Sequence, residues 1–205
     1  MSFPLPWIER VRKTRILAVV NPDSAAETEV LAQSLYARGI TGLELTVRQA
    51  SGLESIRRIK LSCPNMIVGA GTVLNEHQVA AVHGAGADFA LSPGFNPAVV
   101  KAAQNAGLPF APGVCTPSEI ETASALGCRL LTFFPCDPNG GPEFLSAISG
   151  PYLHLGLHFM PRGTFPPASA TAFLQMPQVA ALCAGPDAGG SWDDLALLTG
   201  KQPTH

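Results

Sequence analysis

The sequence predicts a single α/β domain, residues 1–205, folded as a (β/α)8 TIM barrel. Apolar runs of strand length recur eight times along the chain, at intervals of roughly 20–27 residues. Helical patterns alternate with these runs, as they do in parallel βα units. The chain has 205 residues, which is at the lower end of the ~200 to 400 residues usual for this barrel. Eight alternating units favour a closed barrel over an open sheet.

The expected strands are short apolar runs, and four of the eight end at Gly, Pro or Ser. They span residues 16–20, 43–47, 66–71, 89–92, 110–114, 130–135, 155–161 and 179–184. Residues 130–135 are central to the functional prediction. In that run the alternation of a strand places Thr132 and Phe134 on one side and Leu131 and Phe133 on the other.

Capping residues mark the helices between these strands. Asp23-Ser24 and Asn75 precede helical patterns at 25–37 and 76–83, and Asn96-Pro97 and Thr116-Pro117 each place a cap before a first-turn proline. A short N-terminal helix is expected within residues 4–15, before the first strand. Only residues 192–198 are available for the last helix, so the C-terminal helix is expected to be shortened.

Composition narrows the functional class. Hydrophobic residues make up 46% of the chain and charged residues 14%, which is typical of a well-buried globular protein. The net charge is -2 and no basic run occurs, so nucleic acid is not an expected partner. No apolar segment approaches the ~20 residues of a membrane helix. Five cysteines without a CxxC pair, and no recognisable signal peptide, predict reduced thiols in a cytoplasmic protein.

In a barrel of this kind, functional groups lie at the carboxyl ends of the strands. Glu44 falls inside an apolar strand, where a carboxylate needs a partner or a raised pKa to offset desolvation. A purely structural pair with Arg48 is one interpretation. The other is that Glu44 is catalytic and that Arg48 donates two hydrogen bonds to a substrate carboxylate.

Two glycine-rich turns are further candidates. Gly69-Ala70-Gly71-Thr72 lets a ligand approach the backbone, with the Thr72 hydroxyl as a donor. Gly189-Gly190-Ser191 is either an anion cradle or a flexible turn. Arg162, beside Gly163 and Thr164, favours an anion there. No spacing of His, Asp, Glu or Cys indicates a metal site, and no cofactor is expected.

Taken together, the motifs of this chain resemble those of the KDPG/KHG aldolases, named after 2-keto-3-deoxy-6-phosphogluconate. The resemblance runs from about residue 16 to residue 192. It rests on Gly-Leu-Glu-Leu-Thr-Val-Arg (42–48), Ile-Val-Gly-Ala-Gly-Thr-Val-Leu (67–74), Ala-Leu-Ser-Pro-Gly (90–94), Pro-Gly-Val-Cys-Thr-Pro-Ser-Glu (112–119), Phe-Phe-Pro followed by Asn-Gly-Gly (133–141), and Gly-Gly-Ser-Trp (189–192).

The resemblance implies a homotrimeric barrel that cleaves a phosphorylated keto-deoxy sugar acid to pyruvate and an aldehyde. It also implies roles for individual residues. Glu44 would be the general acid/base, and Arg48 and Thr72 would bind the pyruvate carboxylate. Pro93 and Phe134 would shape the pocket. The phosphate would be held by Gly190 and Ser191, with help from the loop containing Gly163 and Thr164.

One departure from the family pattern concerns the nucleophile. The family's Schiff-base lysine falls on Thr132, whose hydroxyl cannot form an iminium ion with a ketone. The chain has four lysines (Lys13, Lys60, Lys101 and Lys201), and none is expected in the barrel interior. Arg162 stands where the family usually has threonine. We hypothesise that the cation has moved one strand along, and that the site keeps an anionic ligand without covalent catalysis.

Three functions remain open on this basis. The first is an aldolase-like lyase acting on pyruvate or a keto-deoxy sugar-acid phosphate through Glu44, with an enolate stabilised by Arg48 and Arg162 or by an added metal. The second is a non-catalytic barrel that binds the same ligands, as a sensor or partner subunit. The third is the family's own imine chemistry, with a lysine reaching the site unexpectedly.

Overall fold

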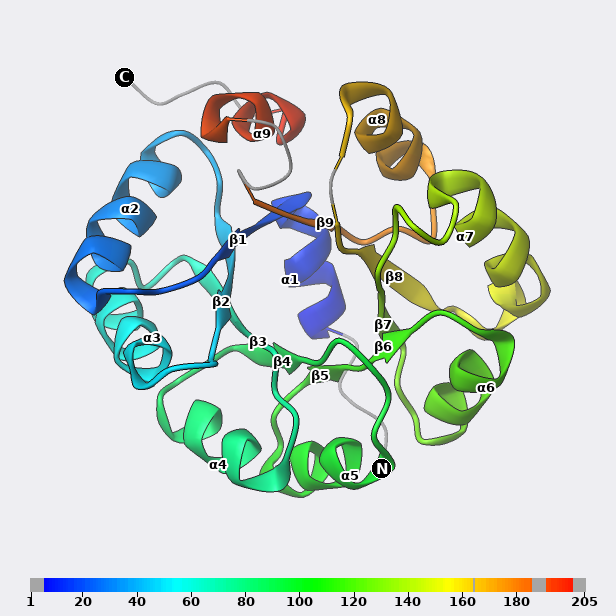
Figure 1. Ribbon diagram of the computed structural model, residues 1–205, viewed down its shortest axis with the longest axis horizontal. Helices are drawn as coiled ribbons and strands as arrows, with labels where there is room; N and C mark the ends of the chain where they lie inside the picture. The colour runs from blue at the N-terminus through cyan, green and yellow to red at the C-terminus, as the bar shows by residue number, and fades with distance from the viewer. Residues whose placement is uncertain (1–5, 164, 186–190, 201–205) are drawn as a thin grey trace.

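A computed structural model of the chain describes residues 6–163, 165–185 and 191–200. Its strands form a ring at the centre, and helices cover the outside of that ring (Figure 1). All strand pairs are parallel. One sheet has six strands in the order β5-β4-β3-β2-β1-β9, and the other has three in the order β6-β7-β8. The α/β class and the parallel sheet are therefore confirmed.

The strands carry the labels of Figure 1. They are β1 (Ile16–Val20), β2 (Gly42–Thr46), β3 (Ile67–Gly71), β4 (Phe89–Leu91), β5 (Phe110–Ala111), β6 (Gly113–Val114), β7 (Leu130–Phe133), β8 (His158–Pro161) and β9 (Leu182–Ala184). The α-helices are α1 (Pro6–Thr14), α2 (Ala25–Ala37), α3 (Ala50–Ser62), α4 (Glu76–Gly84), α5 (Pro97–Ala106), α6 (Pro117–Ala125), α7 (Gly141–Ser149), α8 (Pro167–Gln175) and α9 (Trp192–Leu198). The predicted N-terminal helix and the short last helix are both present.

Three expected strands differ most from the structure, and four others differ from it by one or two residues at their ends. The run 110–114 is divided at Pro112, which has no N–H to donate, and Gly113 instead donates to the carbonyl of Gly94. The run 155–161 begins as a strand only at His158, because residues 150–155 form a 3-10 helix ended by left-handed Gly156. The run 179–184 forms a strand only from Leu182 onwards, since Val179 makes an isolated bridge to Phe159.

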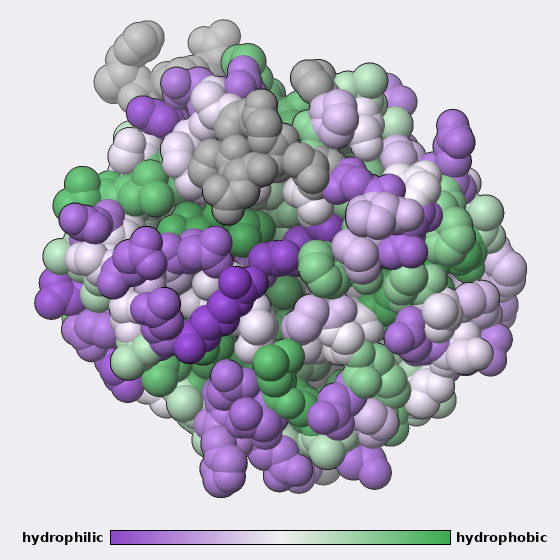
Figure 2. Space-filling view, in the orientation of Figure 1, coloured by the Kyte–Doolittle hydropathy of each residue, from purple (hydrophilic) through white to green (hydrophobic). Residues whose placement is uncertain are grey.

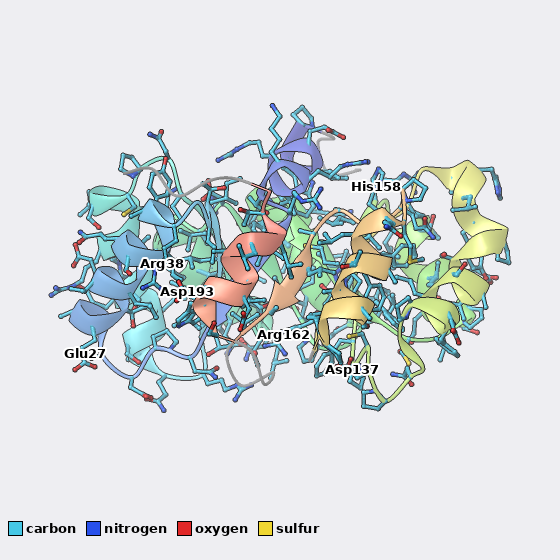
Figure 3. All side chains as sticks on the ribbon, turned by 90° about the horizontal axis from the view of Figure 1, so that it is seen from above. Glu27, Arg38, Asp137, His158, Arg162 and Asp193 are labelled. Atoms are coloured by element: carbon cyan, nitrogen blue, oxygen red, sulfur yellow. The ribbon has the colours of Figure 1, made fainter. Side chains whose placement is uncertain are left out.

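The alternation of the strands separates two apolar cores. Leu43 and Leu45 of β2 pack in the larger cluster with residues of the surrounding helices, whereas Glu44 between them points the other way. The smaller cluster joins α1 to inward positions of the strands, and Trp7 of α1 lies 5.6 Å from the ring of Phe89. One end of the ring is thus filled by apolar side chains beneath α1. Arg162 and Asp137 lie at the opposite end (Figure 3).

Asp88, just before β4, fixes α1 over the apolar end. Its Oδ1 accepts from Arg10 of α1 at 3.1 Å, and its Oδ2 accepts from Lys60 of α3 at 2.8 Å and from the backbone N–H of Val68 at 2.8 Å. The Asp88 side chain is only 14% exposed, so these charged contacts are partly shielded from water. None of the described helices is both long enough and apolar enough to span a membrane.

We expect Asp88→Asn to lower the free energy of unfolding by about 1–2 kcal/mol, because the amide removes the charge that Arg10 and Lys60 share. Urea denaturation followed by circular dichroism measures this. Glu54→Gln is the matched control: Glu54 forms ion pairs with exposed Arg57 and Arg58, and its loss is expected to cost about 0.5 kcal/mol or less. Equal losses in the two variants would contradict a role for Asp88 in fixing α1.

Candidate functional site

A cavity of about 240 Å³ opens at the carboxyl ends of the strands. It is lined by Glu44, Arg48, Thr72, Leu91, Pro93, Phe134 and Arg162. Six of these seven are residues that the sequence predicts for the site. The addition is Leu91, whose signal was its position two residues before Pro93, on the same face of β4. Figure 2 looks onto this end of the molecule, and strongly hydrophilic side chains reach toward the middle of the face.

Glu44 and Arg162 form the ion pair at the base of this cavity. The Nε–H of Arg162 donates to both carboxylate oxygens of Glu44, at 2.9 and 3.0 Å. Glu44 is fully buried, and the Arg162 side chain is 19% exposed. Gly71 of β3 makes room for the carboxylate, because a Cβ there would overlap the Glu44 side chain. The partner of Glu44 is therefore Arg162, 118 residues away, rather than Arg48.

The proton affinities around this pair are set first by burial. Burial raises the pKa of Glu44 above its ordinary value of 4.5, while the charge and hydrogen bonds of Arg162 oppose that shift. Cys183 of β9 is hydrogen-bonded to Glu44 as well. Burial, and then the charge of Glu44, raise the pKa of the Cys183 thiol well above its ordinary 9.0. Cys183 therefore stays protonated and donates to the carboxylate. Its inward position on the last strand was the only sequence signal for this contact.

Arg48 and Thr72 lie at the mouth of the cavity, just beyond β2 and β3. The ends of those strands are paired, with Thr46 opposite Gly71, so the following residues emerge side by side. Arg48 is exposed, and among the described residues no carboxylate lies within ion-pair distance of it. Thr72 has a φ of 63°, a left-handed conformation that costs a β-branched residue about 1–2 kcal/mol. Such strain is concentrated at functional sites.

The opposite wall of the cavity comes from β7, β8 and the turn after β4. The guanidinium of Arg162 lies over the ring of Phe134, 5.3 Å from its centroid, and this contact fixes the plane of the cation. Pro93 closes the side next to β6. A Cβ at Gly113 would overlap the backbone of Pro93, so glycine is needed where these two segments meet.

Thr132 is buried in β7 and is not among the residues that line the cavity. Its hydroxyl donates to the carbonyl of Ala111 at 3.2 Å, and its neighbours in register are Gly113 and Met160. Arg162 follows two residues after Met160, which places it one pleat nearer the cavity mouth than Thr132. Three of the chain's lysines are described. Lys60 bonds to Asp88, Lys13 is exposed on α1 at the other end of the molecule, and Lys101 is exposed on α5, so no described lysine lines the cavity.

The residues predicted to hold phosphate are described only in part. Thr164 and Gly190 lie outside the described residues. Gly163 is half-buried against Asp137 and Cys136, where any side chain would overlap both. Ser191 is the N-cap of α9, and its hydroxyl donates to the Asp194 carboxylate at 2.8 Å while accepting from the Asp194 N–H at 3.1 Å. Gly163 and Ser191, the two described residues predicted to hold phosphate, therefore each lie beside a carboxylate.

A larger hollow of about 590 Å³ lies at the α1 end, lined in part by Arg10, Lys13 and His158. Figure 3 shows His158 at the other end of the molecule from Arg162. Burial, and next the charge of Arg12, lower the pKa of His158. The described charged side chains that line this hollow are exposed, so the smaller cavity, with its buried charge pair, is the functional candidate. Within the described residues, no group of three or more His, Cys, Asp or Glu could hold a metal.

Comparison with known proteins identifies the family. The family model for KDPG and KHG aldolase matches residues 8–194. The chain is 35% identical over 185 residues to the 2-dehydro-3-deoxy-phosphogluconate aldolase of Haemophilus influenzae, covering 90% of this chain and 84% of that one. It is 41% identical over 162 residues to the KHG/KDPG aldolase of Escherichia coli K12, covering 79% and 72%. The KDPG aldolase of Legionella pneumophila, solved with pyruvate captured as a covalent carbinolamine intermediate, superimposes with a TM-score of 0.82 at 28% identity, covering 94% and 96%.

Replacing Arg162 with Met should leave the Glu44 carboxylate buried without its cation. We expect a loss of about 3–5 kcal/mol in the free energy of unfolding at pH 8. The folded-state pKa of Glu44 is already raised by burial and should rise further in the variant. Protonation then relieves the penalty at low pH, so the loss should be small near pH 4.5 and grow as the pH rises. Urea denaturation at pH 5 and pH 8 measures both values.

The control is the double variant Glu44→Gln/Arg162→Met, in which no buried carboxylate remains to titrate. Its stability relative to Glu44→Gln alone should be nearly the same at the two pH values. A pH-independent loss in Arg162→Met would show that the arginine contributes by packing rather than by balancing the charge of Glu44.

Proposed function

Because this chain belongs to the KDPG and KHG aldolase family, we propose that it is an aldolase-like lyase that binds a 2-keto acid in the cavity between Glu44 and Arg48. The proposed ligand is pyruvate or a keto-deoxy sugar-acid phosphate, held without a covalent bond to the protein. The observation that carries the proposal is the charge balance of the cavity. One carboxylate faces two guanidinium groups, and the carboxylate is already paired with Arg162.

Arg48 is the group left to bind an anion. Its fork of N–H donors matches a carboxylate, and the hydroxyl of Thr72 lies beside it at the cavity mouth. A volume of about 240 Å³ is below the range of drug-sized ligand pockets, which suits a molecule of a few heavy atoms such as pyruvate. The buried Glu44 and Arg162 then face the keto end of the same molecule.

The described lining of the cavity, which includes no amine, argues against the imine route. The Legionella relative was captured with pyruvate as a covalent carbinolamine, a species that needs a nucleophilic amine. In the described part of this chain no lysine lines the cavity, and the hydroxyl of Thr132 on β7 is bonded to the carbonyl of Ala111. We propose that binding is electrostatic, with Glu44 as proton acceptor and donor.

A second candidate is a keto-acid-binding barrel without catalytic activity. The observation in its favour is that both oxygens of Glu44 accept from the same Nε–H and that Cys183 donates to the carboxylate as well. These partners oppose the rise in pKa that burial gives Glu44, and so make it a weaker base than an equally buried carboxylate without them. The two candidates share the ligand and differ only in proton transfer.

We also propose that the two sheets form one closed (β/α)8 barrel. Pro112 alone separates β5 from β6, so the two can be counted as a single interrupted strand. Bridges from Phe159 to Val179 and from Arg162 to Cys183 link β8 to β9 on the other side. A homotrimer and a cytoplasmic location remain proposals. The first is implied by the family, and the second is supported by five unpaired cysteines.

We expect pyruvate to bind the wild-type protein and Arg48→Met to weaken that binding by roughly tenfold to a hundredfold, the value of one charge-assisted carboxylate contact. Isothermal titration calorimetry with sodium pyruvate measures the change. Arg57→Met on the exposed face of α3 is the matched control and should bind as the wild type does. No heat of binding at millimolar pyruvate would refute the proposed ligand, and equal affinity in Arg48→Met would refute the proposed contact.

We further expect no stable adduct when the protein is treated with sodium borohydride in the presence of pyruvate, because no described amine reaches the cavity. Intact-protein mass spectrometry detects the reduced adduct. The Legionella KDPG aldolase is the positive control, since pyruvate is captured covalently on it. A pyruvate-dependent adduct would overturn non-covalent binding, and peptide mapping would identify the lysine responsible.

A further inference from the structure

The guanidinium of Arg162 has donors that the ion pair does not use. The Nε–H alone serves both oxygens of Glu44, and the guanidinium plane is held by the ring of Phe134. Four N–H groups on the two Nη atoms remain, and within the described residues none of them has a hydrogen-bond acceptor. Both Arg162 and Glu44 line the cavity. An anionic oxygen that forms beside Glu44 would therefore find vacant donors on the same cation.

From this geometry we propose that the protein enolises 2-keto acids without forming an imine, with Glu44 as the base and Arg162 as the electrophilic group. This inference rests on the proposed function, because it needs the keto acid in the cavity. In pyruvate, the C3–H bond breaks and its proton passes to a Glu44 oxygen. The C–H electron pair forms the C2=C3 double bond, and the carbonyl π pair moves onto oxygen to give the enolate. No oxidant, reductant or second substrate is consumed.

Arg162 meets the electrostatic demand of this step. The negative charge that leaves Glu44 reappears on the ligand oxygen, so the total charge beside the guanidinium is unchanged. A fixed cation in a buried site stabilises such a developing oxyanion without reorganising water. Because Arg162 cannot be deprotonated at neutral pH, it can act only as a donor and never as the covalent sink. Reversal of the step, after Glu44 exchanges its proton with solvent, returns labelled keto acid.

A purely structural role for the Glu44–Arg162 pair explains fewer features of the site than a catalytic role does. A buried ion pair contributes little to stability once desolvation is counted, and it needs no access to a ligand. Here the pair lines a cavity, an exposed arginine stands at the mouth, and Thr72 holds a strained backbone beside it. The hydroxyl of Thr132 is bonded to the carbonyl of Ala111. Arg162 is the described cation in direct contact with Glu44.

The test is the exchange of pyruvate methyl protons in D2O near neutral pH, followed by ¹H NMR with EDTA present. Wild-type protein should exchange them faster than buffer alone, and pretreatment with borohydride and pyruvate should leave the rate unchanged. Glu44→Gln keeps a partner for Arg162 and should lose about a hundredfold or more of the rate. Arg162→Gln should lose about a hundredfold while retaining polar contacts. Glu54→Gln and Arg57→Met are the matched controls and should behave as wild type.

The outcomes separate the two proposals. Pyruvate binding by calorimetry together with no exchange above buffer overturns enolisation and leaves the non-catalytic candidate. Absence of binding overturns the proposed function itself. Exchange that borohydride abolishes would assign the activity to an amine, and exchange that EDTA abolishes would assign it to a metal; either result overturns the role of Arg162. Exchange that persists in folded Glu44→Gln overturns the role of Glu44. Circular dichroism establishes that each variant is folded.

Discussion

A carboxylate in the interior of a ring of strands is the constraint on which the rest of this site depends. Removing the Glu44 carboxylate from water costs free energy, and the surrounding residues offset part of that cost. Gly71 leaves space for the carboxylate, Cys183 keeps a thiol proton to donate, and Arg162 supplies the opposing charge. These three groups come from strands or strand ends far apart in the sequence. The charge is therefore accommodated only when these distant parts of the chain are brought together.

Lysine and arginine solve this electrostatic problem equally but differ in chemistry. An ammonium group beside a buried carboxylate balances charge and, once deprotonated, also attacks a carbonyl. A guanidinium group balances charge and donates hydrogen bonds in a fixed plane, but it does not attack. In this chain the cation that balances Glu44 is the guanidinium of Arg162 at the end of β8, and the inward position on β7 holds the hydroxyl of Thr132. The described lining of the cavity therefore carries opposite charges but includes no amine.

Much of this arrangement could be predicted from the sequence, since strand alternation and strand ends are local properties. They placed Glu44 inside, and Arg48, Thr72, Pro93 and Phe134 around one opening. The partner of Glu44 could not be fixed locally. Four residues along a strand span about 13 Å, too far for Glu44 to pair with Arg48. Arg162 reaches it only because the ring brings β8 near β2. Similarly, the capping bond between Ser191 and Asp194 depends on where α9 begins.

The two ends of the ring show why the polar end can hold a strained and charged site. At the α1 end, Trp7, Phe89 and their neighbours bury apolar surface, and Asp88 ties α1 to β4 and α3. Apolar burial of this kind contributes most of a domain's favourable folding energy. The left-handed Thr72 and the buried pair of Glu44 and Arg162 lie at the other end. Because this apolar packing lies away from the cavity of Glu44 and Arg162, the residues that line the cavity can differ in chemistry while the fold is kept.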